Sequence, residues 1–482
     1  MSVSIFDFQH KQPLLETSFE LAQRHLSLGD QVTYRFLGYD VPNVSFMSPI
    51  TGSLLAGRWL PEQAAARLVA DDRFTFMGRC RVRLRPLWFA VPDTLEDLQT
   101  IEHDGFDLGT AVASSLITRT GNSRVRPGEH RNVVRKMLQG AIAAHEYALD
   151  VLEAEKPDLV YLFNGRFAYE RAVLRACQAK GIRYMIHERG CSPERYYLRP
   201  YTPHDRVPLQ TDIRAVWKEV RDRADETDRA HTWFIERRTG SPRDWPSFTT
   251  GQVAARAPEL ASGNRIIAYF SSSDDEFESI GSEYRWEGWE DQIDAVKGLI
   301  SIVDDLEDTE LVIRVHPNLM TKHADERRRW MCVADGARSA TLIGPESAVD
   351  TYTVMDMANI VVTSGSTMGV ESVYWGRPSI LLRACEYDAL GVSHRAHNLA
   401  ELRSLLLQPS IGADREAALP YGYHRATFGE PYKLYRPHAF SGGTFMGAEL
   451  RPKIWRVAAM ARSKVMSRFP WLGRPLPGSE GR

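Results

Sequence analysis

The pair His316-Pro317 stands directly behind the apolar run ELVIRV at 310–315. Proline removes a backbone donor and favours an extended backbone for the residue before it, so the imidazole is presented at the end of a strand. An imidazole exchanges protons near physiological pH and donates hydrogen bonds to phosphate oxygens. His316 is therefore a candidate for acting on a phosphate or a leaving-group oxygen. A structural histidine at a strand end is the alternative interpretation.

A second candidate group, SGST at 364–367, follows the apolar run 359–363 and precedes a helical pattern. Backbone N–H groups at the start of a helix attract anions, and the hydroxyls of Ser366 and Thr367 add further donors. A simple helix N-cap is the alternative. Glu371 comes one position too late to close a capping box with Thr367, so we expect it to accept hydrogen bonds from a ribose or sugar diol. The expected phosphate-binding residues here are Ser364, Gly365, Ser366 and Thr367.

Further candidates of this half lie at the ends of neighbouring apolar runs. Three consecutive serines, Ser271, Ser272 and Ser273, end the run that begins at Arg265 and offer hydroxyls to a phosphate. Around His316, the expected donor-binding residues are Arg314, Pro317 and Asn318.

An acidic triplet, Asp274, Asp275 and Glu276, follows the serines. Carboxylates in such a cluster are ligands for a divalent cation. No second carboxylate motif stands at a matching strand end, so we interpret the triplet as a helix start or a solvated feature and expect no metal site.

Two polar motifs of the earlier half occupy equivalent positions. NGR at 164–166 follows DLVYLF, and HERG at 187–190 follows IRYMI. Glu188 is the first candidate for a general base and His187 the second, whereas Arg166 and Arg189 suit an anionic group. Asn164 is a further candidate contact. Surface charges that pair with neighbours are the alternative for each of them.

These motifs depend on strands and helices that alternate along the chain, a pattern typical of a parallel sheet with helices on its faces. In the later half, the expected strands are 265–271, 310–315, 340–343, 359–363 and 378–382, with helices over 290–306, from Asp350 and from about Thr367. Parallel strands place their carboxyl ends at one edge of the sheet. We therefore expect His316 and Ser366 to meet in one cleft.

The earlier half has the same alternation. Strands are expected at 158–163 and 182–187 around a helix over 167–181, and a helix followed by a strand is expected before residue 40. With 482 residues the chain exceeds one ordinary hydrophobic core. A stretch rich in Pro, Gly, Ser and Thr at 240–264 separates the halves. The predicted organisation is two Rossmann-like α/β domains, at 1–250 and 264–430, and a tail at 431–482.

Composition excludes several classes of protein. Hydrophobic residues make up 43% and charged residues 25% of the chain, which is ordinary globular usage. A net charge of −2 lacks the positive field that draws proteins to nucleic acid. Five scattered cysteines form no CxxC pair, which argues against a disulfide framework or a zinc site. No apolar stretch reaches membrane-spanning length, so a cytoplasmic protein is expected.

The order of the later motifs, ELVIRVHPN and then DTYTVMDMANIVVTSGSTMGVESVYWGRPSILL, resembles the donor-binding half of GT-B glycosyltransferases that build bacterial capsule and other surface polysaccharides. Capsular Kdo transferases, bacterial sialyltransferases and the polyol-phosphate polymerases of teichoic acid synthesis share this arrangement. The resemblance covers residues 265–400 and does not define the donor.

The resemblance implies a metal-independent enzyme that uses a nucleotide-sugar donor and no cofactor. It implies that His316, Ser364, Ser366 and Thr367 contact the donor phosphate and that Glu371 lies near the nucleoside. The first domain would bind a glycan or lipid-linked acceptor and supply the base. The acidic pair with glycine that sialyltransferases carry has no clear match here, so the base is not assigned by the resemblance.

Three alternatives share the same motifs: transfer of a polyol phosphate from a CDP-linked donor, 2-epimerisation of a nucleotide sugar, and nucleotide-sugar binding without catalysis. The sequence leaves the donor, the acceptor and the stereochemical outcome open.

The tail contains an amphipathic helical pattern at 450–469. We expect its apolar face to pack on the protein, with a membrane-surface helix as the alternative. The opposite face is basic, which predicts at most weak, salt-sensitive association with the inner face of the membrane. The basic residues are Arg451, Lys453, Arg456, Arg462, Lys464 and Arg468.

Overall fold

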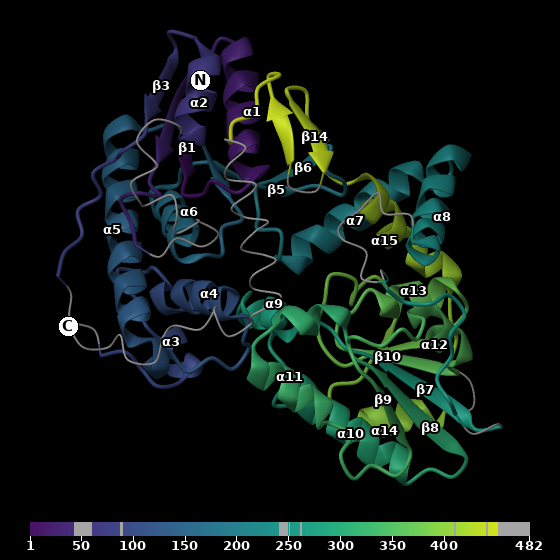
Figure 1. Ribbon diagram of the computed structural model, residues 1–482. Helices are drawn as coiled ribbons and strands as arrows, with labels where there is room; N and C mark the ends of the chain where they lie inside the picture. Colours follow the sequence, from purple (N-terminus) through teal and green to yellow (C-terminus); the bar gives the residue numbers. More distant parts are fainter. Residues whose placement is uncertain are drawn as a thin grey trace.

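The protein is described by a computed structural model that covers residues 1–42, 60–86, 90–240, 249, 251–260, 263–408, 411–439 and 442–451. Two separate sheets, each flanked by helices, form two lobes that face each other (Figure 1). This arrangement confirms the predicted fold class of two Rossmann-like α/β domains. The predicted helix at 450–469 lies outside the described residues except for its first two positions.

The first domain contains a seven-stranded sheet with the order β13-β6-β5-β4-β1-β2-β3. Strands β1 to β5 are parallel, whereas β6 and β13 run antiparallel to their neighbours. The strand β4 is buried along its whole length, as a parallel strand covered by helices on both faces must be. The strands are β1 (Ser2–Asp7), β2 (Gln31–Phe36), β3 (Phe74–Met77), β4 (Leu159–Phe163), β5 (Tyr184–Arg189), β6 (Arg195–Arg199) and β13 (Glu430–Pro431).

Helices of the first domain bury apolar faces against this sheet. The longest, α5, packs on α4 and α6 in one hydrophobic cluster with β4. The helices are α1 (Leu14–Ser27), α2 (Pro61–Val69), α3 (Leu95–Gln99), α4 (Leu108–Thr120), α5 (Arg131–Glu155) and α6 (Ala168–Lys180). A small hairpin of β14 (Tyr435–Ala439) and β15 (Gly442–Phe445) packs beside α1, where Phe445 contacts Phe19.

The second domain contains a six-stranded parallel sheet with the order β12-β11-β10-β7-β8-β9. Its strands confirm the apolar runs expected from the sequence: β7 (Arg265–Phe270), β8 (Thr309–Arg314), β9 (Ala340–Ile343), β10 (Ile360–Thr363) and β11 (Ser379–Leu381), followed by the short β12 (His394–Arg395). Its helices are α9 (Asp274–Glu278), α10 (Gln292–Asp304), α11 (Ala324–Met331), α12 (Thr351–Met357), α13 (Met368–Tyr374) and α14 (Leu399–Leu407). Because β10, β7 and β8 are neighbours, the segments behind them share one edge of the sheet.

Three helices connect the domains: α7 (Arg206–Val220), α8 (Ala224–Thr239) and α15 (Arg415–Thr427). They form a hydrophobic cluster with α13 of the second domain. The ring of Phe234 in α8 stacks on Tyr374 of α13, with centroids 3.9 Å apart. Both α7 and α8 precede residue 250, where the sequence places the domain boundary, yet they pack on the second domain.

The start of the tail is folded onto the first domain. The guanidinium of Arg451 forms an ion pair with the buried carboxylate of Glu16 and donates to the backbone oxygen of His10. None of the helices in the described part of the chain is both long and apolar enough to cross a membrane.

Candidate functional site

Three adjacent strand ends of the second domain are joined by hydrogen bonds. The backbone N–H of His316, behind β8, donates to Oγ of Ser271, behind β7, at 2.8 Å. The Ser272 hydroxyl donates to the backbone oxygen of Ser364, behind β10, at 3.0 Å. The structure therefore brings the serine triplet, His316 and SGST together at one edge of the sheet, as parallel strand order requires.

The hydroxyls of this edge serve two purposes. The side chain of Ser364 is completely buried and bonds the Tyr269 hydroxyl at 2.7 Å, so it fixes the turn from within. Ser271 and Ser272 are also buried. The serine and threonine residues of this edge that are partly exposed are Ser273, Ser366 and Thr367.

Gly365 shapes the turn behind β10. Its φ of +100° lies in the left-handed region, and a Cβ there would lie 2.8 Å from the ring of Phe277. A residue with a side chain would be strained in conformation and would clash, so glycine is required at this position.

The His316 ring is fixed in one tautomer. Its Nδ1 accepts a hydrogen bond from the backbone N–H of Asn318 at 3.1 Å, so the neutral ring carries its proton on Nε2. Burial, together with the positive charges of Lys322, Arg314 and Arg237, lowers the pKa of His316 to about 4. The imidazole is therefore neutral at physiological pH and is a hydrogen-bond donor through Nε2. Pro317 begins the short 3-10 helix Pro317–Thr321 that holds Asn318 in place.

Asn318 and Arg314 have different surroundings. The Asn318 amide donates to Ser273 at 3.1 Å and to Glu276 at 3.3 Å, within the candidate site. The Arg314 side chain is buried and donates to the backbone oxygens of Gly344 and Ser347, which fixes the loop behind β9. In this structure Arg314 acts on the site through its charge and through this loop.

A cavity of about 10 Å³ adjoins His316 between the serine triplet and Lys322. This volume is close to what a single buried water requires. A ligand would therefore bind over this edge rather than inside the cavity.

The acidic triplet is engaged in ion pairs. Asp274 is buried beside Arg383 at 3.4 Å, and Asp275 accepts from Lys322 at 2.7 Å. Burial raises the pKa of Asp274 to about 8. The triplet does begin a helix, since α9 starts at Asp274, but Asp274 and Asp275 are buried, so the triplet as a whole is not a solvated feature.

An arginine that the sequence did not single out completes this side of the site. Arg237, near the end of α8, lies 3.3 Å from the hydroxyl of Thr367 and 3.2 Å from the carboxylate of Glu371. Its position in the basic last turn of a helix is ordinary, because cations favour helix C-termini. No local signal in the sequence distinguishes Arg237 from its neighbour Arg238.

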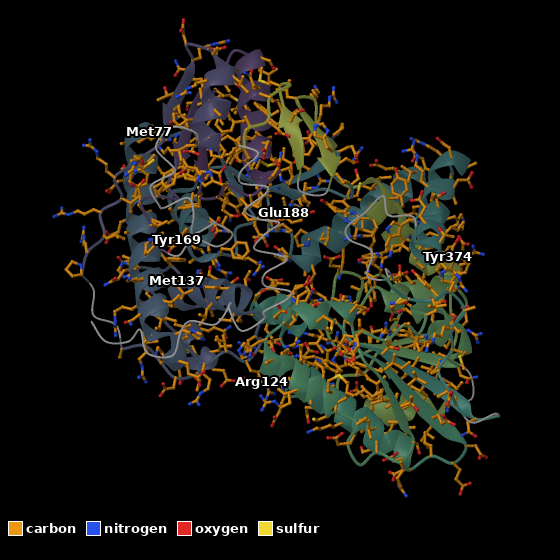
Figure 2. All side chains as sticks on the ribbon, viewed as in Figure 1. Met77, Arg124, Met137, Tyr169, Glu188 and Tyr374 are labelled. Carbon is orange, nitrogen blue, oxygen red and sulfur yellow. The ribbon has the colours of Figure 1, made fainter. Side chains whose placement is uncertain are left out.

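The first domain contributes a carboxylate held by two donors. The Asn164 amide donates to Oε2 of Glu188 at 2.7 Å, and the backbone N–H of Arg189 donates to Oε1 at 2.9 Å. Glu188 is the next-to-last residue of β5 and lies at the side of the first domain that faces the second (Figure 2). The Arg189 side chain donates to the backbone oxygen of Gln12 and so belongs to the support of this strand end.

Arg166 bridges the two domains. It donates to the hydroxyls of Ser114 and Thr118, at 2.9 and 3.2 Å, and to the backbone oxygen of Ser279 in the second domain at 3.4 Å. Burial lowers its pKa to about 10, and the carboxylates of Glu188 and Glu276 oppose this shift. Arg166 thus stays charged between an acidic group of each domain.

His187, the second candidate base, lies in the core. Its side chain is completely buried next to Ser18, and burial lowers its pKa to about 3. Alternation along β5 explains this position, because Glu188 and His187 point to opposite faces.

Direct contacts hold the two lobes together beside the site. Ser123 donates to the buried carboxylate of Glu326 at 3.1 Å, and Arg124 pairs with Asp291. Figure 2 shows Arg124 where the lobes meet. These contacts, together with the Arg166 bridge, hold the first domain against the second on the side where α9 and α11 lie.

A pocket of about 810 Å³ opens beside α8, on the turn of that helix that carries Trp233 and Glu236. It lies between the turn that joins β5 to β6, the helix α8 and the end of α15, and its size falls within the range of small-molecule sites. Trp233 lines the pocket and lies 5.6 Å from the Arg237 guanidinium. Other lining residues are Cys191, Arg195, Thr232, Glu236 and Ala426.

The structure is that of a two-domain α/β protein with polar side chains at the strand ends of both domains. No family model and no curated protein matches the chain. Solved structures that are similar include two structures of KpsC from Thermosulfurimonas dismutans. Its beta Kdo 2,4 transferase is 13% identical, covering 56% of this chain and 80% of that one, with a TM-score of 0.37. Its beta Kdo 2,7 transferase is 14% identical, covering 66% and 89%, with a TM-score of 0.36.

A putative UDP-N-acetylglucosamine 2-epimerase from Listeria monocytogenes is 12% identical over 97% of each chain, with a TM-score of 0.26. At these identities and scores the similarities do not define the activity of this chain.

Proposed function

We propose that this protein is a metal-independent glycosyltransferase, without a cofactor, that moves a sugar from a nucleotide-activated donor to a glycan or lipid-linked acceptor in bacterial surface polysaccharide synthesis. The observation that carries this proposal is the arrangement of the cleft. A neutral imidazole, surface hydroxyls and an arginine lie on one side, and an oriented carboxylate lies on the other.

The donor phosphate would lie over the edge formed by the ends of β7, β8 and β10. Negative charge grows on the phosphate as the glycosyl-phosphate bond breaks, and preorganised donors stabilise that charge. Nε2–H of His316 and the hydroxyls of Ser273, Ser366 and Thr367 are such donors. The departing nucleotide keeps the electron pair of the broken bond.

The acceptor hydroxyl would attack the anomeric carbon from the side of the first domain. Its oxygen forms the new bond to carbon, and its proton passes to the carboxylate of Glu188. The hydrogen bonds from Asn164 and from the N–H of Arg189 fix the direction of this carboxylate. Each bond made is therefore matched by one broken, and no metal is required by this scheme.

The pocket of about 810 Å³ beside α8 is the proposed entrance for the acceptor. It is lined by Cys191, which follows Glu188 by three residues in the chain, and by Trp233, whose ring lies 5.6 Å from the Arg237 guanidinium. Arg195 and Glu236 on its wall offer both donors and acceptors, which suits a polyhydroxylated ligand.

A nucleotide screen followed by turnover tests this function. We expect one of CMP, CDP, UMP, UDP, GMP or GDP to raise the melting temperature, because a ligand that binds only the folded state stabilises it. The corresponding nucleotide sugar should then be consumed with an acceptor glycan. Phosphorus in the glycan product would indicate polyol-phosphate transfer, and an unchanged glycan with an altered sugar nucleotide would indicate epimerisation. Failure of every nucleotide to bind would refute the proposal.

A further inference from the structure

Arg237 is placed rigidly against the residues behind β10. It belongs to α8, which is locked onto the second domain where Phe234 stacks flat on Tyr374, with an interplanar angle of 6°. From there, one Nη2 atom contacts both Oγ1 of Thr367 and Oε1 of Glu371, at 3.3 and 3.2 Å. These contacts join residues at least 130 positions apart.

Both carboxylate oxygens of Glu371 accept hydrogen bonds from protein donors. Its side chain is 0% exposed, one carboxylate oxygen accepts from Arg237, and the other accepts from the Tyr352 hydroxyl. A buried carboxylate is stable only with such partners. A ribose diol could reach it only by displacing one of them, so the sequence-based role of a diol acceptor does not suit this geometry.

The side chain of Arg237, in contrast, is partly exposed. The Arg237 side chain is 32% exposed, whereas Glu371 lies entirely beneath it. The charge of Arg237 also extends to His316, whose pKa it helps to lower. A guanidinium is planar, always charged and shaped to bind phosphate through two N–H groups.

We propose that Arg237 binds the phosphate of the nucleotide ligand next to Thr367, and that Glu371 is a positioning residue that holds Arg237 in place. The inference rests on the proposed function, because the phosphate is that of a nucleotide donor or product. It assigns donor binding partly to the connecting helix α8, which the sequence places in the acceptor domain.

Calorimetric titration with CMP, CDP, UMP and UDP tests the role of Arg237. Arg237→Ala should weaken the nucleotide that binds best by roughly 10-fold to 100-fold, the size expected for charge-assisted hydrogen bonds. Arg237→Lys should keep part of the affinity, since it retains the charge but not the fork. Arg238→Ala is the matched control: this neighbour is equally exposed, at 32%, and pairs with Asp356, so its loss should change affinity less than about twofold.

Salt dependence separates phosphate binding from a structural effect. Affinity of the wild-type protein should fall more steeply with added salt than that of Arg237→Ala, because salt screens the lost charge interaction. Arg237→Gln keeps much of the side-chain stem against Trp233 and is the second variant to use if Arg237→Ala is poorly folded. It should show the same loss of nucleotide affinity.

Glu371→Gln tests the positioning role. It removes the ion pair but keeps the shape, so it should weaken nucleotide binding less than Arg237→Ala does. In the double variant Arg237→Ala/Glu371→Gln, the second substitution should add nothing, because Glu371 acts through Arg237. An additive loss would show that Glu371 contacts the ligand itself and would overturn its assignment.

The outcomes distinguish the two proposals. If a nucleotide binds the wild type and Arg237→Ala retains that affinity with unchanged salt dependence, the inference is wrong and the glycosyltransferase proposal stands. If no nucleotide binds the wild type, both proposals fail together.

Discussion

The Nδ1 atom of His316 accepts a hydrogen bond from the backbone N–H of Asn318, which is only two residues further along the chain. This short loop therefore determines which ring nitrogen carries the proton, and the 3-10 helix behind Pro317 holds the loop. A histidine constrained in this way offers Nε2–H to a ligand without a change of tautomer.

We expect His316→Ala to reduce turnover much more than nucleotide affinity. A donor that acts on the leaving phosphate gains most in the transition state, and loss of one such donor costs roughly 100-fold or more in kcat. Steady-state kinetics and calorimetry on the same preparations give the two quantities. The kcat of His316→Gln, which keeps an N–H donor, should lie between those of His316→Ala and the wild type. Equal losses in kcat and affinity would reduce His316 to a binding residue.

The His316 ring should remain neutral down to about pH 5, because burial lowers its pKa to about 4. The unfolded chain, with an ordinary histidine pKa of about 6.5, binds more protons than the folded chain between these two values. The contribution of His316 to stability is therefore fully present above pH 6.5 and is lost as the pH falls toward 4. Imidazole NMR titration against the His316→Gln variant measures this pKa. A midpoint near 6.5 would contradict the buried, Nδ1-bonded ring.

Glu188→Gln should abolish transfer while leaving nucleotide affinity within about twofold. The amide keeps the shape of the side chain but cannot take the proton of the acceptor hydroxyl. Product formation and calorimetry give the two readouts. Glu153→Gln is the control, since Glu153 forms only a surface ion pair with Lys180. Transfer that persists in Glu188→Gln would move the base to another residue.

Gly365→Ala should destabilise the protein and weaken nucleotide binding. The added Cβ meets the Phe277 ring at 2.8 Å in a backbone with φ of +100°, which costs about 1–3 kcal/mol. Urea denaturation measures this change. Gly412→Ala is the control, because a Cβ at Gly412 would lie in open space and the backbone there has no positive φ. A Gly365→Ala protein as stable as the wild type would show that the turn behind β10 is not as tight as described.

Apolar runs of the second domain predicted its strands closely, because buried parallel strands are apolar on both faces. The convergence of Ser271, His316 and Ser364 followed from strand order alone. The central strand β1 was not anticipated, since Ser2, Ser4 and Asp7 interrupt its apolar residues. Asp7 is buried nonetheless, with its pKa raised to about 7 by that burial, and accepts from Phe8, Gln9 and Tyr34.

The roles of individual side chains were less predictable than their positions. Motif spacing places Glu371 near the site, but its two donors, Tyr352 and Arg237, come from distant segments. The packing of α8 on the second domain depends on Phe234 and Tyr374, which no local pattern connects. Burial of Ser364 and His187 depends in the same way on which face of each strand the partner elements cover.

The pairing of β13 with β6 brings the two chain connections between the lobes next to each other. The chain leaves the first sheet after β6 and returns to it at β13, so both crossings start from neighbouring strands. Two connections that lie side by side act as a hinge. They permit rotation of one lobe about the line that joins them and resist twisting of the lobes against each other. We therefore expect the lobes to separate by rotation about one axis near β6 and β13. The Ser123–Glu326 and Arg124–Asp291 contacts between the lobes must break when they separate.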